Sequence, residues 1–272
     1  MNTNKKKLRS YIFYHLDGIA VIPTILALGK KKILNEFKGE KISLSLLSKK
    51  YNANEGYLNI ALRLLCCQGW LTQYFEDNDI LFQKNSSVDL IEIFNIYKQI
   101  DLFFENNFDY DIFLEFNENK ITEDEVQLQK MINDYLINRK DLIKLNKANI
   151  NLVNHIDGVI LGPILVNLSR KNYLNLNSYD SFNINNRWKQ ILNKLFIYLN
   201  IVKIENNSVT ELGKFLFKRA SAYGVTVSYL PTFRKLNELI FDNPFILWER
   251  EENSAEIHVD RKMNVWGSGG AH

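Results

Sequence analysis

The sequence predicts a mainly α protein with two tandem winged-helix-like modules joined by a helical connector. Three observations predict this fold. The segment HLDGIAVIPTILAL, residues 15–28, is nearly repeated as HIDGVILGPILVNL, residues 155–168. Each copy is followed by segments whose apolar residues recur at helical spacing. After these segments come short runs of β-branched and aromatic residues around turn residues, which is the pattern of a hairpin.

The two copies of the repeated segment begin 140 positions apart. That distance is too long for a solenoid repeat and is typical of a duplicated domain. We therefore expect four parts along the chain. They are a first winged-helix-like module at 1–84, a helical connector at 85–150, a second winged-helix-like module at 151–228, and a helix with an irregular tail at 229–272.

The first module follows the order helix, short helix, turn, longer helix and hairpin, which is that of a winged helix-turn-helix. Residues 10–37 read as a helix, and Ser43 is placed to cap the short helix in KISLSLLSKKY. The longer helix ends at Gly69, as a glycine C-cap would end it. The hairpin strands are predicted at Trp70–Phe75 and Ile80–Phe82, around EDND.

The second module shows the same order less clearly. NINNRWKQILNKLFIYLN carries an apolar helical stripe, IVKI and SVT flank the turn residues ENN as a wing, and Thr210 can cap the helix after it. In the connector, Thr122 and Glu125 form a capping box. Beyond the second module, Pro231–Phe241 is expected to form one amphipathic helix.

Composition places the chain among globular proteins without directing it to a charged partner. The 272 residues are 46% hydrophobic, and 34 Lys and Arg against 31 Asp and Glu give a net charge of +3. The basic N-terminus lacks the cleavage site of a signal peptide, and the apolar stretch from Ile19 to Leu28 is shorter than the ~18 residues of a membrane span. Cys66 and Cys67 are expected to be core thiols of a cytoplasmic protein.

The repeated His, Asp and Gly could form a metal or proton-transfer pair, but a structural role fits them better. Residues two apart on a helix face different ways, so the His and Asp are expected to cap or buttress a helix start. The Gly should let a neighbouring backbone approach. The residues concerned are His15, Asp17 and Gly18 in the first copy and His155, Asp157 and Gly158 in the second.

The helix that would read DNA is poor in basic residues. Glu55–Gln68 carries Arg63 as its single basic residue and is otherwise dominated by Leu, Ile, Ala and Cys. Its counterpart in the second module has Arg187, Lys189 and Lys194 beside aromatic and aliphatic residues. We expect both helices to pack against protein on more than one side, and a DNA-binding regulator remains the alternative.

The sequence contains no catalytic motif that would assign a reaction. It lacks G-x-S-x-G, H-E-x-x-H, a Walker loop and G-x-G-x-x-G after a strand. It therefore predicts neither a catalytic residue nor a metal ligand. The closing WGSGGAH, residues 266–272, is open to two interpretations, an anion or cofactor cradle of backbone amides or a mobile tail.

Three segments resemble known methyltransferases. ILNEFKGEKISLSLLSKKYNANEGYLNIALRLLCCQGWLTQ and SVTELGKFL are similar to the winged-helix regions of small-molecule methyltransferases, which dimerise or cover the substrate. SYLPTFRKLNELIF with EIHVDRKMNVWGSGGAH resembles the segment ahead of the S-adenosylmethionine domain in methyltransferases that accompany polyketide synthases, of the apratoxin and saxitoxin synthase type. The donor-binding glycine motif of that family does not occur in the sequence.

The resemblance implies a non-catalytic N-terminal portion that covers substrate and oligomerises. S-adenosylmethionine would bind the full-length protein and not this chain alone. Implied partners are a C-terminal methyltransferase domain, a second copy of the chain and an acyl substrate on a carrier protein, with neither a membrane nor nucleic acid. A winged-helix regulator and a stand-alone adaptor are the alternatives. The implied cofactor residues are Trp266, Gly267, Ser268, Gly269, Gly270 and His272, and the implied substrate-facing residues are Tyr229, Phe233 and Trp248.

Overall fold

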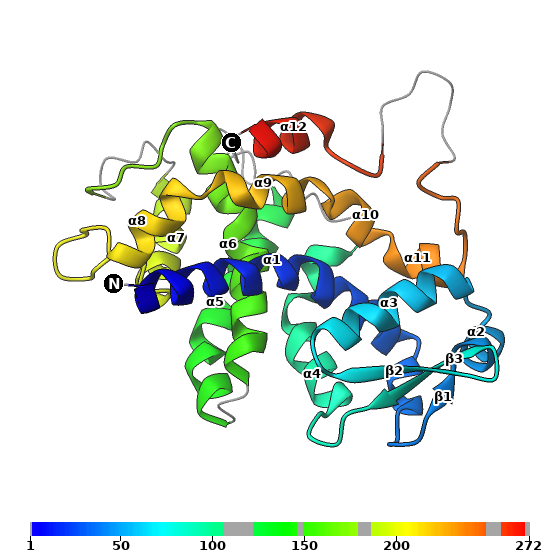
Figure 1. Cartoon of the computed structure of the whole chain (residues 1–272). Helices are drawn as coiled ribbons and strands as arrows, with labels where there is room; N and C mark the ends of the chain where they lie inside the picture. Colours follow the sequence, from blue (N-terminus) through cyan, green and yellow to red (C-terminus); the bar gives the residue numbers. More distant parts are fainter. Residues whose placement is uncertain (1, 106–121, 146–148, 179–185, 249–256, 270–272) are drawn as a thin grey trace. The chain divides into compact units, whose positions relative to one another are not determined.

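The computed structural model of the chain describes residues 2–105, 122–145, 149–178, 186–248 and 257–269 (Figure 1). It is mainly α with one small sheet, so the predicted fold class is confirmed. The chain forms two compact units, each assembled from separate stretches of sequence. Unit 1 comprises Met1–Ile19, Leu102–Tyr229 and Asp260–His272, and unit 2 comprises Ala20–Asp101 and Leu230–Val259.

Unit 2 contains a complete winged helix. The second part of the long helix α1 belongs to this unit and is followed by short helices, a three-stranded sheet and two C-terminal helices. Their bounds are α1 Asn2–Lys30, η1 Ile33–Glu36, β1 Ile42–Ser43, α2 Leu44–Tyr51, α3 Glu55–Cys67, β2 Leu71–Glu76, β3 Asp79–Lys84, α4 Leu90–Tyr97, η2 Lys98–Phe104, α10 Leu230–Arg234 and α11 Leu236–Phe241.

Local signals in the sequence fix the elements of this winged helix. The sheet is antiparallel in the order β1-β3-β2, and α2 and α3 pack on it (Figure 1). Ser43 accepts a hydrogen bond from the Leu46 N–H and so caps α2. Gly69 follows α3 with φ of 72°, a left-handed conformation that favours glycine. These predictions are confirmed.

The predicted helix bounds in unit 2 differ from the observed ones at two places. The first helix ends at Lys30 and resumes only as η1, because Lys32 adopts a left-handed backbone conformation with φ of 63°. The second difference concerns Pro231–Phe241, which forms α10 and α11 instead of one helix. Lys235 donates its N–H to the carbonyl of Thr232 in a tight turn and so separates the two.

The prediction of two core thiols is wrong. Cys66 is half-buried and Cys67 is exposed. Neighbouring residues on a helix point about 100° apart, and α3 turns Leu58, Leu62 and Leu65 toward the core. The two adjacent cysteines at the C-terminal end of α3 therefore cannot both point into the core.

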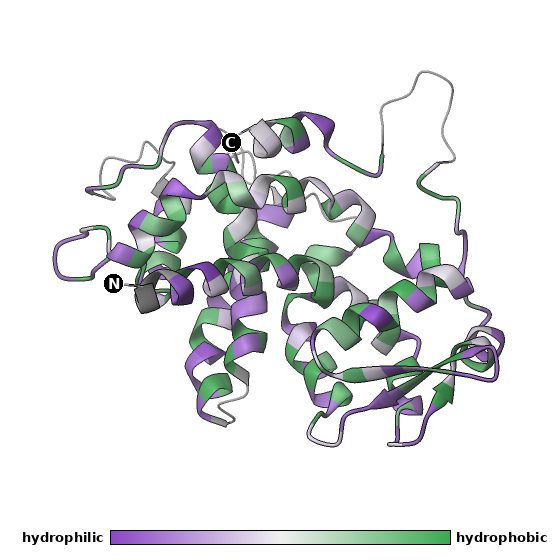
Figure 2. Cartoon of the chain, in the orientation of Figure 1, coloured by the Kyte–Doolittle hydropathy of each residue, from purple (hydrophilic) through white to green (hydrophobic). Residues whose placement is uncertain are grey.

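Unit 1 is a bundle of helices around α6. It contains the first part of α1 with α5 Glu123–Leu145, α6 Asn149–Arg170, α7 Asn186–Tyr198, α8 Glu211–Lys218, α9 Ser221–Ser228 and α12 Arg261–Gly269. Figure 2 shows apolar residues over much of the central part of α6, and nearly all residues from Leu152 to Leu168 are buried. The core of this unit therefore surrounds the second copy of the repeated segment.

The second wing is reduced. Residues 200–210 form no regular strand, and Val202 pairs with Val209 only through an isolated bridge. The turn between the two valines is short. Asn200 and Asn207, each two residues before a paired valine, adopt left-handed backbone conformations that interrupt the extended backbone, so only one pair forms. Thr210 nevertheless caps α8 by accepting a hydrogen bond from the Gly213 N–H, as predicted.

Within the described residues, two helical stretches are long and apolar enough to cross a membrane, Lys6–Lys30 and Ile150–Arg170. The expectation that the N-terminal segment is too short is therefore wrong. The most apolar window is 67% buried in the first stretch and 94% buried in the second. Such burial is typical of the core helices of soluble proteins, so length and composition are weak evidence for a span here.

Candidate functional site

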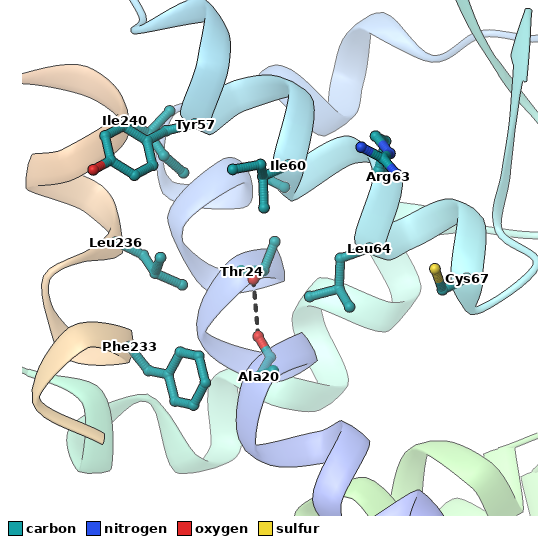
Figure 3. A pocket seen from close by; sticks show the side chains of 11 residues that line it. Ala20, Thr24, Tyr57, Ile60, Arg63, Leu64, Cys67, Phe233, Leu236 and Ile240 are labelled. Carbon is teal, nitrogen blue, oxygen red and sulfur yellow. Dashed lines mark hydrogen bonds between the residues drawn. The ribbon is translucent and has the colours of Figure 1, made fainter. Parts of the chain in front are cut away.

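Unit 2 contains an apolar cavity of about 450 Å³ beside helix α3 (Figure 3). This volume lies within the range of small-molecule binding sites. Helix α1 forms the floor, α3 forms one wall, and α10 and α11 form the opposite wall. The lining residues are Ala20, Thr24, Tyr57, Ile60, Ala61, Arg63, Leu64, Cys67, Phe233, Leu236 and Ile240.

Helix α3 has two apolar faces, and the cavity lies on the second. Its first face packs into the core of the unit with Leu58, Ala61, Leu62 and Leu65. Its second face carries Tyr57, Ile60 and Leu64 at helical spacing, and Ile60 is 63% exposed. The helix that would lie against DNA in a winged-helix regulator therefore presents hydrocarbon to this cavity.

Backbone contacts hold the opposite wall in place. The Asn54 N–H, just before α3, donates to the carbonyl of Ile240 in α11 at 2.7 Å. The Thr232 hydroxyl in α10 donates to the carbonyl of His258 at 2.5 Å. The first bond ties the C-terminal end of this wall to the start of α3, and the second ties its N-terminal end to His258.

The cavity offers few polar groups. The Thr24 hydroxyl donates to the carbonyl of Ala20 at 2.8 Å and is thereby satisfied within α1 (Figure 3). Arg63 lies at the edge, is exposed, and has no hydrogen bond or ion pair with any residue that the structure describes. Burial raises the pKa of the Cys66 thiol to about 11; Cys67 adds to this shift and Arg63 opposes it.

One of the predicted substrate-facing residues, Phe233, lines the cavity of unit 2. Trp248 is 59% exposed, and its ring lies 4.9 Å from the ring of His258. Tyr229 follows α9 in unit 1 and is partly exposed. Their assignment to substrate stays a prediction.

The described part of the predicted cofactor segment is helical. Trp266, Gly267, Ser268 and Gly269 are the last residues of α12, where backbone N–H groups donate within the helix, and their assignment to the cofactor stays a prediction. Gly267 also packs against Gly224 of α9, where a Cβ would lie 2.6 Å from the Val225 nitrogen. Gly270 and His272 lie outside the described residues.

Sequence reasoning did not identify most of the cavity. Tyr57, Ile60, Leu64, Leu236 and Ile240 were not selected as site residues, although the sequence contained one signal for them. A helix as apolar as Glu55–Gln68 is expected to be covered on more than one side, and the residues opposite its core face are those that line the cavity.

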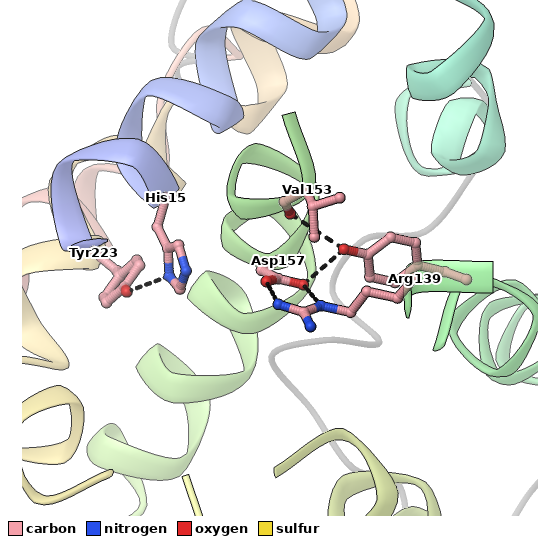
Figure 4. A network of polar contacts seen from close by, with 6 residues as sticks. His15, Arg139, Val153, Asp157 and Tyr223 are labelled. Atoms are coloured by element: carbon pink, nitrogen blue, oxygen red, sulfur yellow. Dashed lines mark hydrogen bonds and ion pairs between the residues drawn. The ribbon is translucent and has the colours of Figure 1, made fainter. Parts of the chain in front are cut away.

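Unit 1 contains a buried polar network (Figure 4). Asp157 accepts hydrogen bonds from Arg139 at 3.0 and 2.7 Å and from the Tyr135 hydroxyl at 2.7 Å. His15 Nδ1 lies 2.7 Å from the Tyr223 hydroxyl oxygen. Burial raises the pKa of the Asp157 carboxyl, while Arg139 and Tyr135 oppose the shift. None of these groups lines the cavity beside α3, and we interpret the network as structural because its members bond to one another in the core of the unit.

Burial also keeps the two histidines of the repeat uncharged. It lowers the pKa of His15 to about 3, with His155 and Arg139 adding to the shift, and lowers the pKa of His155 to about 4. Both residues lie within helices and far from their first turns, so the expectation that His and Asp cap a helix start is wrong. Asp157 is buried and ion-paired, whereas Asp17 is exposed.

The repeated glycines permit a close helix crossing, as predicted. A Cβ on Gly18 would lie 2.3 Å from the carbonyl oxygen of His155, and a Cβ on Gly158 would lie 2.3 Å from that of His15. The two copies of the repeat therefore contact each other reciprocally, each glycine against the histidine of the other copy.

No group of three or more His, Cys, Asp or Glu side chains in the described ranges could hold a metal ion. The polar side chains among the described residues that line the cavity are those of Thr24, Tyr57, Arg63 and Cys67. The arrangement in unit 2 is suited to binding an apolar group.

Fold and site together define a mainly α protein with a winged helix whose third helix faces an apolar cavity. Residues 8–73 match the family model of the AprA N-terminal domain, and residues 157–243 match that of the AprA winged helix domain. These matches are consistent with an AprA-type N-terminal region. Neither model describes a methyltransferase domain. No curated protein matches the chain.

Proposed function

We propose that this chain is the non-catalytic portion of a cytoplasmic S-adenosylmethionine-dependent methyltransferase, where it covers the substrate and supports oligomerisation. A separate methyltransferase domain would hold the methyl donor, and the acceptor would be an acyl group on a carrier protein in polyketide biosynthesis. The two AprA-type matches support the family, and the resemblance of the C-terminal residues to the segment before a donor-binding domain supports the placement.

The single observation that carries the proposal is the second face of α3. Tyr57, Ile60 and Leu64 face the apolar cavity, and Arg63 is the one basic residue of the helix. A recognition helix needs several polar and basic side chains to contact bases and phosphates. The composition of α3 therefore favours contact with an organic molecule or with protein over contact with DNA.

The physical role of such a portion is to position one reactant. Methyl transfer gains chiefly from holding donor and acceptor in the correct geometry, and a cover also excludes water. The residues of this chain would contribute by binding and orienting the apolar part of the acceptor. No proton transfer or covalent step is assigned to them.

Calorimetry with S-adenosylmethionine tests the division of labour. We expect binding to the chain joined to a methyltransferase domain and none to the 272-residue chain alone. A methyltransferase domain lacking this chain should still bind the donor but transfer methyl groups roughly a hundredfold more slowly, the size of effect that misplaced reactants produce. Equal donor binding by the chain with and without that domain would contradict the proposal.

The alternative of a DNA-binding regulator rests on the complete wing and helix-turn-helix order of residues 42–84. It is tested by a DNA mobility assay at two salt concentrations. Binding that weakens steeply with salt would support the regulator, because released counterions drive such binding. We expect no shifted band at low salt.

A further inference from the structure

The cavity in unit 2 has the features of a ligand site that the family matches do not assign. It is bounded on three sides by helices of the same unit and has a volume of about 450 Å³. The Asn54–Ile240 hydrogen bond joins the wall formed by α11 to the start of α3, and Thr232 of α10 is bonded to His258. The site is therefore largely formed before any ligand arrives, which reduces the entropy cost of binding.

The interior of the cavity suits a hydrocarbon chain. In Figure 3, Ile60 and Leu64 project from α3 toward Leu236 and Phe233 on the opposite wall, above Thr24 on the floor. The Thr24 hydroxyl is already bonded within its own helix. A polar ligand group placed between these walls would lose its hydrogen bonds to water without replacement, whereas methylene groups would be favoured by about fourfold in affinity for each one buried.

The edge of the cavity suits an anion. Arg63 is the single cationic residue among those that line it, and it has no ion pair in the described part of the chain. A guanidinium binds a carboxylate through two parallel hydrogen bonds. Among the described residues that line the cavity, none is acidic and could compete for Arg63.

We propose that this cavity binds an apolar carboxylate of medium chain length, with the hydrocarbon between α3 and α10–α11 and the carboxylate at Arg63. The inference needs only the cavity and Arg63, so it holds or fails independently of any methyltransferase role.

The first test compares ligands on the whole chain. Calorimetry with hexanoate and octanoate should show roughly fifteenfold tighter binding for octanoate, the effect of two added methylene groups. Octanol has the same chain without the charge and should bind at least fivefold more weakly than octanoate. Equal affinity for octanol and octanoate would overturn the assignment of Arg63, and no detectable octanoate binding at millimolar concentration would overturn the site.

Cys67 provides a test of location, because it lines the cavity and is exposed. Octanoate should slow the reaction of this thiol with a neutral maleimide, measured in a Cys66→Ser variant so that one thiol remains. A rate unchanged at saturating octanoate would place the ligand elsewhere and overturn the proposal.

Variants separate the two parts of the site. Leu64→Trp should fill the cavity and lower octanoate affinity at least tenfold. Arg63→Gln should remove the preference for octanoate over octanol and leave octanol binding unchanged. Lys49→Gln, in α2 and away from the lining, is the matched charge control and should bind as the parent does. Circular dichroism checks that each variant folds.

Two further outcomes would overturn the proposal. If a folded Leu64→Trp variant bound octanoate with parental affinity, the ligand would not occupy this cavity. If the chain were a dimer that Ile60→Asp converts to a monomer, and octanoate left the dimer intact, the apolar face of α3 would be an interface between copies.

Discussion

The reciprocal crossing of α1 and α6 in unit 1 predicts that Gly18→Ala strongly destabilises the protein. The new Cβ would lie 2.3 Å from the carbonyl oxygen and 2.5 Å from the Cα of His155. Carbon atoms in contact are ordinarily about 3.5 Å apart, so the two backbones would have to separate by about 1 Å. No side-chain rotation can relieve a contact between backbone atoms.

The magnitude follows from two opposing effects. Overpacking of a close-packed interior costs about 1 to 3 kcal/mol and more when the backbone must move. Replacing glycine by alanine within a helix stabilises the folded state by about 1 kcal/mol, because alanine has the higher helix propensity. Because the contact is with backbone on a buried helix, we expect the packing cost to dominate. The net loss in free energy of unfolding should be about 3 kcal/mol, measured by urea denaturation followed by circular dichroism.

Gly56→Ala is the matched control. Gly56 lies in the first turn of α3, is exposed, and a Cβ there would meet only the side-chain oxygen of Asn54, at 3.3 Å. This variant should be within about 1 kcal/mol of the parent. A Gly18→Ala protein as stable as the parent would refute the crossing geometry.

The double variant Gly18→Ala/Gly158→Ala gives an independent check. Both new methyl groups would push the same two helices apart. The second substitution should therefore lower the free energy of unfolding less in the double variant than it does as a single substitution. Costs that simply add would indicate that the two glycines do not share one contact.

The remaining predictions concern the buried network of unit 1. In the folded protein the pKa values of His15 and His155 are about 3 and 4, whereas both are about 6.5 in the unfolded chain. The contribution of the two neutral histidines to stability is therefore complete above pH 6.5 and is lost as the pH falls toward 3. The free energy of unfolding, measured by urea denaturation, should drop by about 3 kcal/mol between pH 7 and pH 5. The raised pKa of Asp157 partly opposes this drop. A free energy of unfolding that does not change with pH would contradict the burial of the two histidines as neutral groups. Asp157→Asn would leave the half-buried Arg139 without its carboxylate and should cost about 3 kcal/mol in the same assay at pH 7, whereas Asp17→Asn, its exposed counterpart, should cost less than about 0.5 kcal/mol.

Features determined by neighbouring residues could be predicted from the sequence. Ser43 and Thr210 cap helices, and Gly69 ends one, because each acts on backbone groups within a few positions of itself. The hairpin β2–β3 was also predictable, since Asp77 and Asn78 form its tight turn in left-handed conformations that these residue types tolerate.

The cavity depends on contacts that local signals do not encode. Its far wall is the segment Leu230–Phe241, which meets α3 only through the fold of unit 2. Helical spacing showed that α3 has a second apolar face, but spacing cannot show whether another helix, another chain or a ligand covers it. The break between α10 and α11 at Lys235 was also not predicted. The apolar residues at 231–241 are compatible with one continuous helix, so the local sequence does not indicate the break.

The crossing in unit 1 explains which residues of the repeated segment are kept and which have diverged in environment. Each glycine must stay small because the histidine backbone of the other copy lies against it, and this requirement is the same for Gly18 and Gly158. The aspartates have no such shared requirement. Asp157 faces Arg139, which comes from the connector, and the connector follows only the first copy along the chain. The glycines are therefore the same in both copies because the two copies contact each other through them. The two aspartates differ in environment because α5, which carries Arg139, packs against α6 at Asp157.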